Sequence, residues 1–163
     1  MSSQITSVDT ILIDLPTIRP HKLSMATMAR QTMVIVRMGF SDGIEGLGEA
    51  TTIGGLSYGS ESPEGIKLAI DRYITPLLIG QPADNLNALR ARIDRHVRGN
   101  QLAKSAIETA LLDGQGKRQD LSVAELLGGA RQSHLPVLWT LASGDTRKDI
   151  DEAFAMIEAG RHR

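Results

Sequence analysis

Residues 32–50 carry the sequence TMVIVRMGFSDGIEGLGEA, and this stretch decides the fold. Residues 32–38 follow an extended pattern that is typical of a β-strand. Asp42-Gly43 is a hairpin dipeptide, because the tight turns between antiparallel strands need positive φ angles, which glycine adopts without steric penalty. A further strand is expected over residues 44–50, and its glycines keep it narrow. The stretch therefore predicts an antiparallel hairpin.

The residues before the hairpin predict one more strand. β-Branched side chains are frequent over residues 5–15, and Pro16 is expected to end this strand. Residues 17–23 are polar and contain a second proline, so they are expected to form a loop that enters the next strand. Residues 43–49 superficially resemble a glycine-rich phosphate loop, but no helix pattern follows them and the hairpin is the favoured interpretation.

A helical period begins after the glycine-rich residues 53–59. Ser62 is a suitable N-cap and Pro63 a suitable first helical residue, so a helix is expected to begin there. Pro76 is expected to kink or end this helix. The chain therefore changes from strands to helices at this point.

Two more helices are expected in the middle of the chain. Asp84 or Asn85 is expected to cap the first of them, which Gly99 closes. Asn100 is expected to cap the next, whose buried face consists mostly of small side chains. Such a face allows another element to approach closely.

The last part of the chain predicts a different kind of unit. A capping box at residues 122–125 opens a short helix that ends at two glycines. Residues 135–141 are expected to form a buried strand, residues 143–145 a turn, and a helix is expected to end near Gly160. This is one βα unit, which needs neighbouring strands and helices to cover it. We expect a domain boundary here, with one domain at residues 1–130 and the start of another at 131–163.

Composition narrows the function classes. The chain has 163 residues, of which 41% are hydrophobic and 23% charged, as in a globular domain. Its net charge of −1 gives no basic field for nucleic acid, and no apolar run approaches the roughly 20 residues of a membrane helix. No secretory leader is evident, so a cytoplasmic location is expected. The chain has no cysteine, and its four histidines show no metal-binding spacing.

The acidic residues and serines do not predict catalytic machinery. Glu45, Glu49, Asp113 and Asp145 stand singly on different expected elements, so they do not predict a cation site. No Gly-x-Ser-x-Gly sequence is present, so serine hydrolysis is not supported either.

Two loops contain candidate ligand-binding residues. Tyr58 lies in the glycine-rich segment that Ile53 opens, so these residues are candidates for a lid, although packing of Tyr58 over the junction of sheet and helix is the favoured interpretation. His21 lies between Arg19 and Lys22 and could meet an anionic substrate, or this could be a solvated basic loop.

A third candidate position lies near the end of the last expected strand. Trp139-Thr140 would end a barrel strand, which is where barrel enzymes place functional residues. Core packing is the favoured interpretation for Trp139 by itself.

Several strings of the sequence are distinctive when they are taken together. They are DLPTIRPHKL at 14–23, GEATTIGGLSYG at 48–59, ESPEGIK at 61–67, ALLD at 110–113, QGKR at 115–118, ELLGG at 125–129 and WTLASGD at 139–145. These strings resemble the muconate cycloisomerases of the enolase superfamily. The resemblance extends over essentially all 163 residues, and residues 53–58 and 20–22 are similar to the muconate branch in particular.

The resemblance implies a fold and a reaction. The fold is an α+β capping domain, with a three-stranded antiparallel sheet and a helical bundle, followed by the first βα unit of a truncated (β/α) barrel. The family interconverts cis,cis-muconate, a small dicarboxylate, and muconolactone in catechol degradation, with Mn²⁺ as the usual metal and a barrel lysine as acid/base. The resemblance assigns His21, Ile53, Tyr58 and Thr140 to substrate contact and implies a homo-oligomer.

The resemblance also implies what these residues lack. In the family, a strand with a Lys-x-Lys sequence follows the position of residues 161–163, and three acidic metal ligands lie on later strands. This chain matches none of them, so we expect no catalytic residue, no bound metal, no turnover by the chain alone and doubtful oligomer formation. Two alternatives remain open, namely part of a chloromuconate cycloisomerase and a free-standing capping or interaction domain.

Overall fold

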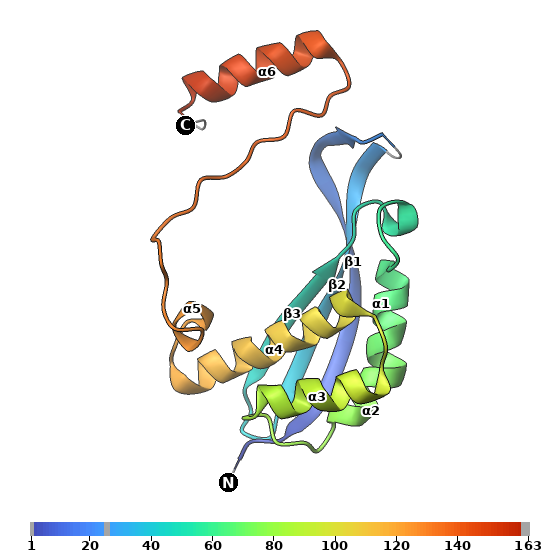
Figure 1. The fold of residues 1–163 in the computed structure, drawn as a ribbon, viewed down its shortest axis with the longest axis vertical. Helices are drawn as coiled ribbons and strands as arrows, with labels where there is room; N and C mark the ends of the chain where they lie inside the picture. Colours follow the sequence, from blue (N-terminus) through green and yellow to red (C-terminus); the bar gives the residue numbers. More distant parts are fainter. Residues whose placement is uncertain (1, 25–26, 161–163) are drawn as a thin grey trace.

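The centre of the fold is a three-stranded antiparallel sheet (Figure 1). The structure is a computed structural model and describes residues 2–24 and 27–160. The strands are β1 (Ile5–Lys22), β2 (Thr27–Phe40) and β3 (Glu45–Thr51), in the order β1-β2-β3. The predicted hairpin is confirmed, because β2 and β3 pair antiparallel across a turn in which Gly43 has φ of 83°.

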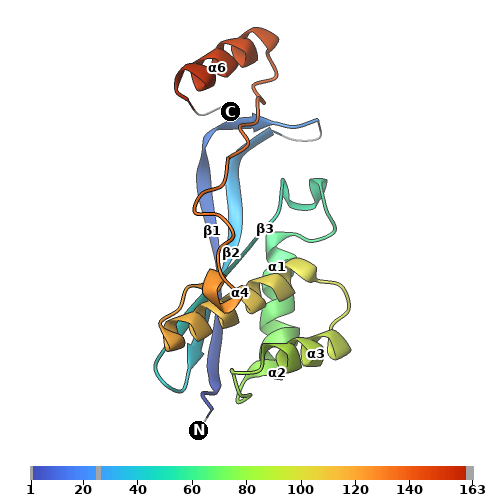
Figure 2. The same cartoon turned by 60° about the vertical axis from the view of Figure 1, so that its left-hand side comes forward.

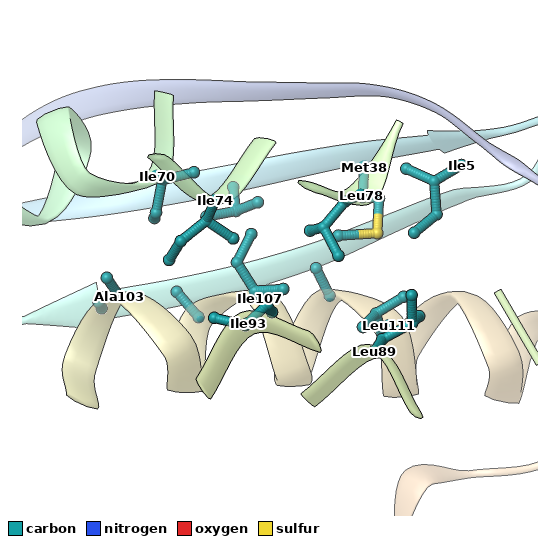
Figure 3. Close-up of a cluster of buried hydrophobic side chains, with 14 of the residues drawn as sticks. Ile5, Met38, Ile70, Ile74, Leu78, Leu89, Ile93, Ala103, Ile107 and Leu111 are labelled. Atoms are coloured by element: carbon teal, nitrogen blue, oxygen red, sulfur yellow. The ribbon is translucent and has the colours of Figure 1, made fainter. Parts of the chain in front are cut away.

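One face of this sheet is buried under helices. Val34, Val36 and Met38 alternate along β2 and are fully buried, and the small residues that alternate along β3 are buried as well. The core that they form with the helices is almost entirely aliphatic (Figure 3). Its largest buried side chains outside β2 are Ile5, Ile66, Ile70, Ile74, Leu78 and Ile107.

Strand β1 is longer than the sequence predicts. Pairing with β2 runs through Pro16 opposite Arg30, shifts register, and resumes at His21 opposite Met28. The prediction that Pro16 ends the strand and that residues 17–23 form a loop is therefore wrong. The physical reason is that β1 is an edge strand, where a residue without a backbone N–H is tolerated. Beyond the end of β3, β1 and β2 continue as a two-stranded ribbon (Figure 1).

The first helical segment is continuous and contains a π-helical part. Helix α1 (Pro63–Ala69) begins as predicted, because the Ser62 hydroxyl accepts a hydrogen bond of 3.1 Å from the Gly65 N–H. A π-helical segment, η2 (Ile70–Ile74), connects it to α2 (Thr75–Leu78). Pro76 does not end the helix at its own position, because α2 continues to Leu78. Proline has no N–H for the preceding turn, and a wider turn accommodates the loss.

Helices α3 (Leu86–His96) and α4 (Gln101–Gln119) begin in different ways. The Asn85 side chain caps α3 through a 3.0 Å hydrogen bond from the Ala88 N–H. The predicted cap at Asn100 is wrong, since its φ of 53° directs the side chain back to the Arg98 carbonyl. A side-chain cap needs an extended backbone at that residue. At α4, a Glu61 carboxylate oxygen accepts a hydrogen bond from the Leu102 N–H instead.

Helix α4 lies unusually close to β3, as its small residues predict. A Cβ atom on Gly46 would lie 2.0 Å from the Ala110 carbonyl oxygen, and one on Gly48 would lie 1.9 Å from that of Ala106. Both distances are far below van der Waals contact, so only glycine fits at these two strand positions.

The C-terminal part contains two helices that lie far apart (Figures 1 and 2). Helix α5 (Val123–Leu126) lies by the end of α4 and has the predicted capping box, and α6 (Thr146–Glu158) lies at the tip of the β1–β2 ribbon. The predicted strand at 135–141 is wrong, because these residues are extended but pair with no strand among the described residues. A β-strand needs backbone partners, and here Val137 and Leu138 are 80% and 87% exposed. Residues 161–163 of the predicted barrel segment lie outside the described residues.

Candidate functional site

A hollow of about 410 Å³ lies at the tip of the β1–β2 ribbon. Three segments that are distant in the sequence border it: the end of β1 with the start of β2, Ile53 shortly after β3, and the extended segment before α6. Its lining is mostly apolar, which is typical of sites for small organic ligands. The lining residues are Thr17, Ile18, Arg19, His21, Leu23, Met28, Ile53, Trp139 and Thr140.

Three of the four residues that the resemblance assigns to substrate contact meet at this hollow. His21 is on β1, Ile53 follows β3, and Thr140 is in the extended segment. The alternation of β1 puts His21 on the same strand face as Arg19, and both side chains are half-buried. The hollow thus has a polar wall on β1 and an apolar contact at Ile53.

Tyr58 lies apart from this group. It is 66% exposed and borders a second hollow of about 310 Å³ together with Thr52 and Glu61. Ile53 borders both hollows, so the two are neighbours. The short helix η1 (Gly55–Ser57) lies between Ile53 and Tyr58 in the predicted lid.

The predicted lid is anchored at both ends. The Gln31 amide on β2 donates a 2.5 Å hydrogen bond to the Thr52 carbonyl and another to the Thr51 hydroxyl, and Glu61 bonds to the start of α4. Between these anchors none of the residues 53–60 is buried. Fixed ends and an exposed middle are what a loop that closes over a ligand requires.

Arg19 is a residue whose role the sequence did not indicate. Its guanidinium forms an ion pair with Glu152 on α6, donates a 2.5 Å hydrogen bond to the Thr140 carbonyl and lies 4.8 Å from the centre of the Trp139 ring. The Trp139 indole N–H donates a 3.1 Å hydrogen bond to the same carboxylate of Glu152. No local pattern signals this cluster, because Arg19 and Glu152 are 133 positions apart. Trp139 is half-buried in the cluster rather than part of the core.

The segment before α6 is also fixed on the other side of the cluster. The Lys22 N–H donates a 3.0 Å backbone hydrogen bond to the Ala142 carbonyl, and the Lys22 stem lies against Gly144. The Ser143 hydroxyl and backbone N–H both stabilise the Asp149 carboxylate, which lowers the pKa of Asp149. These contacts hold the turn that begins α6.

Two of the carboxylates singled out in the sequence, Glu45 and Asp113, are bound to other partners. Glu45 pairs with Arg37 at 2.7 Å, and Asp113 accepts hydrogen bonds from Lys117 and the Leu47 N–H. Among residues 2–24 and 27–160, no three His, Asp or Glu side chains are grouped so that they could hold a metal ion. The described residues therefore do not fit the metal that the resemblance implies. None of the described helices is both long and apolar enough to cross a membrane.

The fold and the hollow together define a class of protein. An antiparallel sheet with helices on one face, presenting a strand ribbon and a loop at one end, is an α+β capping domain. Residues 7–128 match the model of the N-terminal domain of the mandelate racemase / muconate lactonizing enzyme family. The chain belongs to this family.

Proteins similar to this chain include muconate and chloromuconate cycloisomerases. Muconate cycloisomerase 1 of Pseudomonas putida is 59% identical over 161 residues, which are 98% of this chain. A chloromuconate cycloisomerase of Cupriavidus necator is 48% identical over 98% of the chain. The crystal structure of a muconate lactonizing enzyme from Pseudomonas fluorescens complexed with muconolactone matches 97% of the chain with a TM-score of 0.94 and 61% identity.

The chain spans less than half the length of these relatives. It covers 43% of the Pseudomonas putida and Cupriavidus necator proteins and 43% of the chain in the Pseudomonas fluorescens structure. The matched family domain ends at residue 128, before the extended segment and α6.

Proposed function

We propose that this chain forms the capping part of a muconate cycloisomerase and closes over cis,cis-muconate. The observation that carries the proposal is the hollow in which His21, Ile53 and Thr140 meet from three separate segments. The high identity to muconate cycloisomerases supports the choice of substrate. We place the domain boundary near residue 130, so that residues 131–163 begin a barrel domain.

The chemistry of the four residues suits a planar dicarboxylate with an apolar carbon chain. His21 and Thr140 can donate hydrogen bonds to carboxylate oxygens, and Ile53 offers an apolar contact to the carbon chain between them. Tyr58 would approach when residues 53–60 close, and closure would exclude water from the site. These residues bind and orient the substrate and do not transfer a proton.

The proton transfer and the metal belong to groups that the described residues do not supply. In the complete enzyme we propose that Mn²⁺ and a lysine act from the barrel side of the substrate, in the cytoplasm and in aromatic catabolism, within a homo-oligomer. The 163 residues alone are proposed not to turn muconate over, and neither nucleic acid nor a membrane is proposed as a partner.

A chloromuconate substrate is the second candidate. The observation in its favour is the 48% identity to chloromuconate cycloisomerases over nearly the whole chain. The muconate cycloisomerases are more similar, at 54% to 59% identity, so muconate is preferred.

A chimaeric enzyme tests the proposal. The corresponding segment of Pseudomonas putida muconate cycloisomerase 1 is replaced by this chain, and loss of the muconate ultraviolet absorbance is followed with Mn²⁺ present. Retained activity, with a raised KM in the His21→Ala and Ile53→Ala chimaeras, is expected. A folded chimaera that prefers chloromuconate would favour the second candidate, and one that uses neither substrate would refute the proposal. The chain alone with Mn²⁺ should not exceed a metal-only control.

A further inference from the structure

Arg19 joins the β1–β2 ribbon to the segment that leads into α6. All of its partners are more than 100 positions away in the sequence: the Glu152 carboxylate, the Thr140 carbonyl and the Trp139 ring. We propose that Arg19 is a positioning residue, which fastens residues 139–142 to the ribbon and thereby forms one wall of the hollow. That the hollow receives substrate rests on the proposed function, whereas the fastening does not.

The contacts of Arg19 use both its charge and its shape. One terminal nitrogen is paired with Glu152, the other donates to Thr140, and the planar face lies over the indole. Lysine cannot reproduce this arrangement, because an ammonium has neither a planar face nor two donors in a fixed fork. The three partners therefore specify arginine.

The same geometry disfavours an alternative role. A basic residue next to His21 could be a ligand for a substrate carboxylate, but Glu152 already neutralises the guanidinium. The two side chains are only 29% and 21% exposed, so the pair is partly shielded from solvent ions. A substrate carboxylate would have to displace Glu152 to bind here.

The cluster is closed by Trp139. Its indole N–H donates to the carboxylate oxygen of Glu152 that also pairs with Arg19. The neighbouring backbone hydrogen bond from the Lys22 N–H to the Ala142 carbonyl also attaches the segment to the ribbon. By contrast, Val137 and Leu138 just before the cluster are more than three-quarters exposed. The attachment of the segment to the ribbon thus depends on few groups, of which Arg19 is central.

The single tryptophan of the chain makes the attachment measurable. The full chain is prepared as wild type, Arg19→Ala, Arg19→Lys and Glu152→Gln, and each is measured first without substrate and then in a titration with cis,cis-muconate. The control is Arg30→Ala, which removes an exposed ion pair with Asp14 on the same ribbon but lies away from Trp139. Acrylamide quenching of Trp139 and hydrogen exchange of the Lys22 amide report on the two attachments, and circular dichroism establishes that each variant is folded.

We expect Trp139 to become more accessible to acrylamide in Arg19→Ala. The Lys22 amide should exchange about tenfold faster, which is the effect of losing one charge-assisted hydrogen bond. Arg19→Lys and Glu152→Gln should lie between wild type and Arg19→Ala, and Arg30→Ala should match wild type.

Three other outcomes distinguish this role of Arg19 from the alternatives. Unchanged quenching and exchange in a folded Arg19→Ala variant would overturn the proposal. Unchanged Trp139 accessibility combined with loss of muconate binding in both Arg19 variants would make Arg19 a substrate ligand instead, which also overturns it. If Trp139 becomes more accessible to acrylamide as expected but no variant binds muconate, the positioning role of Arg19 is supported and only the proposed function is contradicted.

Discussion

Replacing Gly48 by alanine tests the contact on which the capping fold depends. The added Cβ would lie 1.9 Å from the Ala106 carbonyl oxygen, 2.9 Å from the Thr109 hydroxyl and 3.0 Å from the Ala106 carbonyl carbon. Two of these three atoms are backbone atoms of α4, so a side-chain rotation cannot relieve the clash. The helix must move away from β3, or the strand must bend.

The size of the effect follows from the cost of overpacking. An extra methyl group in a packed interior typically lowers the free energy of unfolding by about 1–3 kcal/mol. Because the neighbours of Gly48 are rigid backbone atoms, we expect Gly48→Ala to lower it by about 3 kcal/mol. For a domain of this size such a loss corresponds to a decrease in Tm of roughly 10 °C. Thermal and urea unfolding followed by circular dichroism measure both quantities.

A matched control separates the clash from the general effect of replacing glycine. A Cβ on Gly59 would meet no atom within 4 Å, and its φ is not positive. Gly59→Ala should therefore leave the free energy of unfolding unchanged or raise it by up to about 1 kcal/mol, because alanine restricts the unfolded chain. If Gly48→Ala unfolds at the same temperature as Gly59→Ala, the close approach of α4 to β3 is refuted.

Further predictions concern the helix starts and one acidic group. Asn85→Ala should lower the free energy of unfolding by about 1 kcal/mol in urea, because it removes the side-chain cap of α3. Asn100→Gly should be neutral or stabilising in the same assay, since Asn100 has φ of 53° and caps nothing. Arg118 lowers the pKa of Asp42 from 3.8 to about 2. A lowered folded-state pKa stabilises the protein above pH 3.8, and this stability is lost as the pH falls toward 2. Asp42→Asn should therefore flatten the pH dependence of the free energy of unfolding between pH 4 and 2, and an unchanged slope would contradict the pairing.

The sequence predicted those features that depend on neighbouring residues. The turn at Asp42-Gly43, the Ser62 cap and the capping box at residues 122–125 each involve groups within a few positions of one another, and the structure has all three. The small face of α4 also predicted a close neighbour, although the sequence did not say which. Its partner is the pair of glycines in β3. The small residues on each side of this contact are therefore visible in the sequence.

The wrong predictions share a different cause. Whether Pro16 ends a strand depends on whether that strand lies at the edge of the sheet, which no local pattern reveals. The Asn100 side chain failed as a cap because its backbone entered the left-handed region after Gly99, and Glu61 from another segment bonds to the helix start instead. Residues 135–141 have the composition of a buried strand but no strand partner among the described residues. In each case tertiary context overrode the local preference.

The candidate site was predictable only in part for the same reason. His21, Ile53 and Thr140 were assigned through a family resemblance, and no spacing in the chain would bring them together. In the sequence Arg19 is only a basic neighbour of His21, because its partner Glu152 is 133 positions away. Long-range pairs of this kind carry no sequence signal in a single chain.

The walls of the hollow are held in place by different parts of the fold, so they can be altered separately. His21 and Ile53 are both fixed through β2: His21 pairs with Met28 on this strand, and Gln31 on the same strand binds Thr52 next to Ile53. Their separation is therefore set by the register of one sheet and is insensitive to what happens at α6. The wall at Thr140 is held by Arg19 and Lys22 instead. A change at Arg19 should thus alter one wall while leaving the other two in place, so its effect on ligand affinity should be separable from that of His21→Ala or Ile53→Ala.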